Sequence, residues 1–417
     1  MMMSFPMQAA DMPVLSATTG VRRYAASLFI LILSALLITP VKAMTAETWI
    51  PASDDVVLAD LPASNSPLWR AIRTWRSTLE KQPDNQQAAA ALARAYLELR
   101  RVTGDPRYLG YAQAALAPWW QQAKPPADIL LVRARLKQTQ HQFSAATKDL
   151  QQLLMQQPRN TQAWLLLASV AMVQGNYELA RSACAQLLFQ AAPLVSTSCV
   201  AQLGSMTGKL DASYELLKNR LQASSKKTDT LVQWTSTLLA EMAVRRGDMQ
   251  AAKQHFEQAL SAGQPDIYLI SAYADYLLAT EQAEKVIALL DDRRQVDPLL
   301  LRLAIAMKAL NMPETGTAIK QLQRRFDAMR RRGDDTHLRE DARFMLELQN
   351  NPEQALKFAQ GNWRQQHEIV DALLLARAAL VTGDIAAAKP VLEWQQKNNV
   401  EGVQLTALLA ELQERGL

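Results

Sequence analysis

Apolar and small residues recur in this chain at a spacing of 34 positions. The period is clearest between the segments 127–158 and 161–192, which carry four equivalent pairs: Leu130 and Trp164, Ala134 and Ala168, Phe143 and Tyr177, and Ala146 and Ala180. A period of this length indicates a repeated helical hairpin. One hairpin cannot bury its own apolar stripe, so hairpins must stack, and we expect an open curved ribbon rather than a closed pocket. This architecture favours binding over catalysis.

The segment 161–192 shows how each hairpin should be built. Gly175-Asn176 marks the turn between its two helices. Ala168 and Ala180 should lie where the helices cross, because larger side chains there would force the pair apart. Pro158 closes the preceding unit, at a position between helices where its missing amide hydrogen is tolerated.

This pattern of residues resembles the tetratricopeptide repeat. It has large apolar residues early in the first helix, small residues at the crossing, an aromatic residue in the second helix and a proline between units. Segments around Ala240, Ala274 and Ala376 fit the same grid. The resemblance implies an all-α solenoid, a right-handed superhelix of antiparallel helix pairs, over residues 68–417. Residues 403–415 should form a capping helix. The stretches PASDDVVLADLP and YADYLL are similar to exported bacterial repeat proteins of unassigned role.

One stretch departs clearly from the grid. The crossing residues Ala93 and Ala112 are 19 positions apart, whereas Ala168 and Ala180 are 12 apart. We therefore expect the turn between these two helices to carry a protruding loop of about seven additional residues.

The N-terminus has the features of an export signal. Arg22 and Arg23 precede an uncharged apolar run from Tyr24 to Ile38, and cleavage is expected after Ala43. The run is 15 residues long, shorter than the roughly 20 that a spanning helix needs. We therefore expect a signal peptide at 1–43, an extended leader at 44–67 and a periplasmic protein. The alternative is an uncleaved anchor in the inner membrane, facing the periplasm, which would be the chain's sole link to a membrane.

Charge and cysteine content fit this interpretation. The chain carries a formal net charge of +5, and removal of residues 1–43 leaves 42 basic and 39 acidic residues. This near balance gives no reason to expect nucleic acid as a partner. In an oxidising compartment Cys184 and Cys199 can form one disulfide, since they lie in successive predicted helices on either side of a turn. The alternative is a pair of buried thiols.

No motif indicates catalysis, a metal site or a cofactor. The four histidines, His141, His255, His337 and His367, lie far apart in sequence, without the short spacings of a zinc site. No phosphate-binding glycine loop or nucleophile elbow is present in the sequence. We therefore expect a protein that is not an enzyme, with an envelope glycan-processing enzyme or accessory as the alternative.

In the first helix of each hairpin, the side chains that do not pack against neighbouring helices should line the groove. In the best units these positions are Arg135, Gln138, Ser169, Met172, Gln202, Trp234, Glu241, Arg245, Tyr268 and Asp275. This mixed polar lining suits a protein or an extended peptide. The clamp for peptide carboxylates found in some tetratricopeptide proteins is absent, because its positions hold Leu131 and Arg135 in one unit and Leu165 and Ser169 in the next. We expect a protein-interaction scaffold in envelope assembly or secretion.

Overall fold

The computed structural model describes residues 66–225, 228–333 and 336–417, and over these ranges the chain is helical without a β-strand. The expected signal segment 1–43 and residues 44–65 of the expected leader lie outside the described residues. Within the described ranges, no helix combines the length and apolar character required to cross a membrane.

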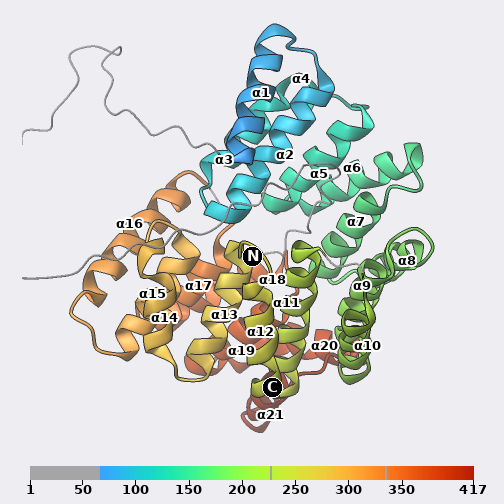
Figure 1. The fold of residues 1–417 in the computed structure, drawn as a ribbon. Helices are drawn as coiled ribbons and strands as arrows, with labels where there is room; N and C mark the ends of the chain where they lie inside the picture. The colour runs from blue at the N-terminus through green and yellow to red at the C-terminus, as the bar shows by residue number, and fades with distance from the viewer. Residues whose placement is uncertain (1–65, 226–227, 334–335) are drawn as a thin grey trace, which may run out of the picture. The chain divides into compact units, whose positions relative to one another are not determined.

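Nine antiparallel hairpins follow one another in the described part of the chain, between a leading helix α1 (Pro67–Lys81) and a last helix α21 (Val403–Glu414) (Figure 1). The first members, here called A helices, are α2 (Gln86–Thr103), α5 (Ala127–Thr139), α7 (Thr161–Val173), α9 (Pro193–Ser205), α11 (Asp229–Arg246), α13 (Ile267–Ala279), α15 (Asp297–Ala309), α17 (Leu338–Glu347) and α19 (Ile369–Thr382). The second members, the B helices, are α3 (Arg107–Ala115), α6 (Phe143–Gln156), α8 (Tyr177–Leu188), α10 (Leu210–Ala223), α12 (Met249–Ser261), α14 (Ala283–Leu290), α16 (Thr315–Arg331), α18 (Pro352–Trp363) and α20 (Lys389–Asn398). A single turn of helix, α4 (Ala117–Trp120), lies between α3 and α5, and short 3₁₀ turns follow α14 and precede α20.

The turns between A and B helices follow from their residues. Gly175 has a φ of 69° after the end of α7, a left-handed conformation that glycine adopts without strain. Asn176 then begins α8 as its N-cap, and its side chain accepts a hydrogen bond from the Leu179 amide at 3.1 Å. Asp248 does the same for α12. These local signals reverse the chain within two or three residues.

Small side chains lie where the helices of a pair cross. Ala168 of α7 and Ala180 of α8 are both fully buried, as are Ala134 and Ala146 in the preceding hairpin. Tyr177 is also buried, at the start of α8. The expected all-α solenoid of helical hairpins is therefore confirmed, and the alanines occupy the close contact that the spacing predicted.

The predicted loop between Ala93 and Ala112 was wrong. Helix α2 continues to Thr103 and α3 begins at Arg107, so the additional residues lengthen the helix and the turn stays short. The extension is anchored by Arg101, whose guanidinium group lies 3.0 Å from the Asp266 carboxylate at the start of α13. The repeat pattern does not determine whether these additional residues form helix or loop. The contact with a distant hairpin stabilises the helix.

The expectation of a ribbon that is open along its length also requires correction. Later hairpins return to contact the turns of earlier ones. The His367 amide, just before α19, donates a hydrogen bond to the Val173 carbonyl at 2.7 Å. The Trp394 indole of α20 donates to the Tyr177 hydroxyl at 3.2 Å. The last hairpins are thereby fixed against the α7–α8 turn, and the A helices enclose space between them.

The two cysteines are paired in the structure. Cys184 of α8 and Cys199 of α9 form a disulfide with their Cα atoms 5.6 Å apart, a separation that a bridge allows. Both residues are buried. The bridge joins the B helix of one hairpin to the A helix of the next.

We expect Ala168→Trp to destabilise the protein by at least about 1–3 kcal/mol, because the indole would push α7 and α8 apart. Ala185→Trp is the matched control, since Ala185 is exposed on α8. Thermal and urea denaturation of the two variants would measure the difference. Equal midpoints for both variants and the parent would show that Ala168 does not lie at a tight crossing.

We expect the Cys184–Cys199 bridge to stabilise the oxidised protein by about 3 kcal/mol, the value for a closed loop of this length. Dithiothreitol should therefore lower the denaturation midpoint of the parent and leave that of the Cys184→Ala, Cys199→Ala double variant unchanged. Rapid maleimide labelling of both thiols in the unreduced native protein would contradict the bridge.

Candidate functional site

A cavity of about 740 Å³ lies along the wall formed by the A helices. Helices α7, α9, α11, α13, α15, α17 and α19 all contribute side chains to it. The B helices pack behind them, so the cavity faces the inner side of the stack. Its size is in the range of ligand-binding sites in proteins.

Seven of the ten residues expected in the groove line this cavity: Ser169, Met172, Gln202, Glu241, Arg245, Tyr268 and Asp275. The other three do not line it. Gln138 and Trp234 are each 5% exposed and are part of the packing between helices. Arg135 lies on α5, an A helix that contributes nothing to the cavity wall.

Asp275 joins three neighbouring A helices on the wall. Its carboxylate accepts hydrogen bonds at 2.5 Å from Arg302 of α15 and at 2.5 Å from Arg343 of α17. Burial alone would raise the pKa of Asp275, but the two guanidinium groups outweigh it and lower the pKa. Asp275 is therefore ionised at neutral pH, and it neutralises part of the charge of both arginines.

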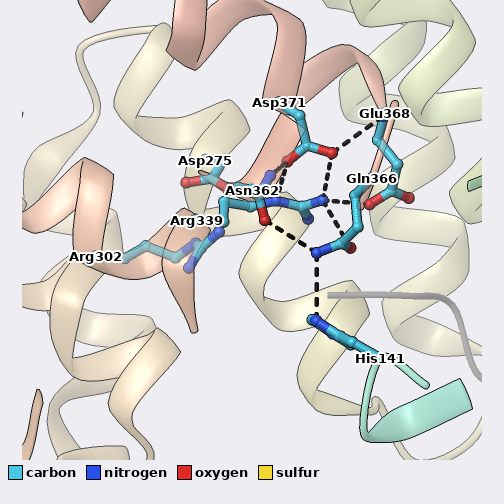
Figure 2. A network of polar contacts seen from close by, with 8 residues as sticks. All are labelled: His141, Asp275, Arg302, Arg339, Asn362, Gln366, Glu368 and Asp371. Atoms are coloured by element: carbon cyan, nitrogen blue, oxygen red, sulfur yellow. Dashed lines mark hydrogen bonds and ion pairs between the residues drawn. The ribbon is translucent and has the colours of Figure 1, made fainter. Parts of the chain in front are cut away.

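A second ionic network connects α17 with the start of α19 (Figure 2). Arg339 donates to Asp371 at 2.5 and 2.8 Å and also binds Glu368. Asn362 donates to the same Asp371 at 2.6 Å, and Gln366 donates to Asn362 at 3.0 Å. Asp371 is almost fully buried, so this network replaces the hydration that the carboxylate loses.

The same network extends to an early hairpin. Figure 2 shows the side-chain amide of Gln366 approaching the His141 ring, with 3.4 Å between Gln366 Nε2 and His141 Nδ1. Burial lowers the pKa of His141 to about 3. His141 is therefore neutral near pH 7, and it meets the network as a hydrogen-bonding group without charge.

Glu241 has a different environment from the other carboxylates of the wall. It accepts a hydrogen bond from the Tyr268 hydroxyl, and no ion pair within the described residues involves it. Burial raises the pKa of Glu241 to about 7, although the bond from Tyr268 opposes this shift. Near neutral pH the carboxyl group is thus partly protonated.

Arg245 is held by backbone carbonyl groups instead of a carboxylate. Its guanidinium group donates to the carbonyl oxygens of Ser205 and, at 2.9 Å, of Glu401 in the segment before α21. Burial lowers its pKa to about 10, so the group stays charged at neutral pH. Its role in the wall is to fix the C-terminal segment against α9 and α11.

The sequence interpretation missed the part of the wall that α19 provides. Val370, Leu373, Arg377 and Val381 of this helix line the cavity. The signal was present, because Arg377 follows Ala376 as Ser169 follows Ala168 and as Asp275 follows Ala274. The repeat pattern itself was predicted around Ala376, but the groove residues were predicted only for earlier hairpins.

Within the described ranges, no grouping of histidine, cysteine, aspartate or glutamate side chains has the arrangement to hold a metal ion.

Comparison with known proteins gives one family. Residues 131–194, which include α6, α7 and α8, match the model of the tetratricopeptide repeat. No curated protein sequence matches the chain significantly.

Solved structures with a similar arrangement include a tetratricopeptide repeat protein from Parabacteroides merdae, with 20% identity, a TM-score of 0.39, and coverage of 61% of this chain and 90% of that one. The Cut9–Hcn1 hetero-tetramer of the APC/C has 16% identity and a TM-score of 0.36, covering 75% of this chain and 52% of that chain. The monomeric IFIT1 mutant bound to Gppp-AAAA has 13% identity and a TM-score of 0.38, covering 78% and 76%.

We expect Arg339→Met to lower the free energy of unfolding by about 3–5 kcal/mol, because it leaves buried Asp371 and Glu368 without their cation. Arg415→Met is the control, since it removes only an exposed pair with Glu411 and should change stability little. Urea denaturation measures both effects. Equal midpoints for the two variants would show that the Arg339 network does not hold α17 and α19 together.

Proposed function

We propose, from the premise that this chain is a tetratricopeptide-repeat protein, that it is a scaffold whose inner wall binds a protein partner through an extended segment. The observation that carries the proposal is the cavity itself, which residues from seven A helices line. Solenoids of this kind use the surface formed by successive repeats for binding. An extended segment would contact several hairpins at once and so gain specificity from the whole wall.

We further propose that the protein acts outside the cytoplasm, in envelope assembly or secretion. The basis is the N-terminal sequence, in which Arg22 and Arg23 precede an apolar run and a cleavage signature at Ala43. The Cys184–Cys199 pair supports the same compartment, since structural disulfides persist in oxidising environments.

An envelope glycan-processing enzyme or accessory is the second candidate, and Glu241 is the observation in its favour. A carboxyl group with a pKa raised to about 7 can act as a general acid near neutral pH. Against this, Asp275, Glu347 and Glu368 on the wall are all paired with arginines. These ion pairs engage three of the carboxylates that line the cavity, so Glu340 is the remaining lining carboxylate that could act with Glu241.

Site-specific photocrosslinking in the producing cells tests the scaffold proposal. A benzophenone side chain at Ile305, on the cavity wall, should give one discrete adduct with an exported protein. The same group at Glu257, which is exposed on α12, should give none. Absence of an adduct at Ile305, together with cleavage of glycan strands that Glu241→Gln abolishes, would replace the scaffold by the enzyme.

A further inference from the structure

Helix α19 presents an uncovered apolar face to the cavity. Val370 is 50% exposed and Val381 is 61% exposed. Leu373 lies between them on the same face and is half-buried. Spacings of three, eight and eleven residues place these side chains along one side of the helix. Apolar side chains are usually buried when a protein folds. A contiguous apolar strip that stays exposed on a cavity wall is therefore typical of a surface that contacts a ligand.

Arg377 lies in the middle of this face and differs from the other arginines of the wall. It lines the cavity and is exposed there. Arg302 and Arg343 share Asp275, and Arg339 binds Asp371. The Arg377 side chain takes part in no hydrogen bond or ion pair with another described residue. The apolar face therefore carries one cation whose charge the described part of the protein leaves uncompensated.

Other parts of the wall are apolar and adaptable. Met172 of α7, Met206 after α9 and Met242 of α11 line the cavity together with Ile305 of α15. Methionine side chains are flexible and polarisable, so they adjust to apolar groups of different shape. The cavity thus combines apolar side chains from several helices with the Arg377 guanidinium group, which no described side chain pairs with.

We propose that this cavity binds a single-chain amphiphilic carboxylate, with its apolar chain along Val370, Leu373 and Val381 and its carboxylate on Arg377. A guanidinium group binds a carboxylate through two parallel hydrogen bonds, which are stronger where water is partly excluded. The volume of about 740 Å³ is in the range of small-ligand sites.

A small amphiphile satisfies the site better than a stretch of peptide does. A peptide brings an amide and a carbonyl group with every residue, and each needs a partner when it is buried. On this wall Asp275 already pairs with Arg302 and Arg343, and Arg339 already pairs with Asp371. An acyl chain makes no such demand. This inference and the scaffold proposal place different occupants in the same cavity. The two ligands must therefore compete, and a test with both of them distinguishes the proposals.

Calorimetric titration of the full chain with decanoate, below its micellar concentration, tests the proposal. Decanol is the matched probe without charge. We expect decanoate to bind about tenfold more tightly than decanol, which corresponds to about 1.4 kcal/mol from the charged contact. Arg377→Gln should abolish this preference, and Arg377→Lys should retain most of it. Val381→Ser should weaken both ligands, because it removes part of the apolar face.

Arg415→Gln, on the exposed side of α21, is the control and should leave both titrations unchanged. Circular dichroism of each variant verifies that the helices are intact. Failure of decanoate to bind the parent, or equal binding to the parent and to Arg377→Gln, would overturn the proposal. It would also be overturned if a leucine–aspartate hexapeptide displaced decanoate and bound more tightly, and in that case the scaffold proposal would stand.

Discussion

The close crossing of the two helices in each hairpin determines the rest of the structure. An alanine of the A helix is fully buried at this crossing in seven of the described hairpins, at positions 134, 168, 240, 274, 304, 342 and 376. The absence of a larger side chain lets the helices approach, and it also fixes the rotation of the A helix about its axis. Because each residue turns the helix by about 100°, the next residue must face away from the B helix. It faces the inner wall, and six of these next residues line the cavity: Ser169, Glu241, Asp275, Ile305, Arg343 and Arg377.

This rule explains how much the sequence could predict. The spacing of 34 residues and the alanines at the crossings were sufficient to predict the hairpins and their turns. They also predicted seven of the residues that line the cavity. The return of the last hairpins was not predictable from the repeat, because it depends on contacts between residues far apart. The bond from the His367 amide to the Val173 carbonyl involves backbone atoms, which leave no mark on the sequence. The length of α2 depends in the same way on Arg101 and the distant Asp266.

Buried ion pairs connect neighbouring repeats along the inner wall. Asp275 links α13 to α15 and α17, and Arg339 links α17 to the start of α19. Such pairs contribute little net stability, since desolvation of the charges offsets much of their attraction. Their effect is on arrangement: any other register of these hairpins would leave a charge buried without a partner. The pairs involve Arg302 of α15 and both Arg339 and Arg343 of α17, so these two A helices are the part of the chain that they hold in register.

The ion pairs also determine what the wall can offer to a ligand. Charges that neutralise one another within the wall do not attract a partner of either sign, so a balanced set of side chains behaves as a polar but largely neutral surface. Arg377 of α19 stands outside this balance, because no carboxylate of the described residues forms an ion pair with it, whereas Asp275 of α13 pairs with Arg302. Helix α19, at the end of the repeat array, thus places on the cavity wall a guanidinium group that no described carboxylate pairs with. Closure of the stack brings that end against α7 through His367, so a feature of the terminus becomes part of an enclosed site.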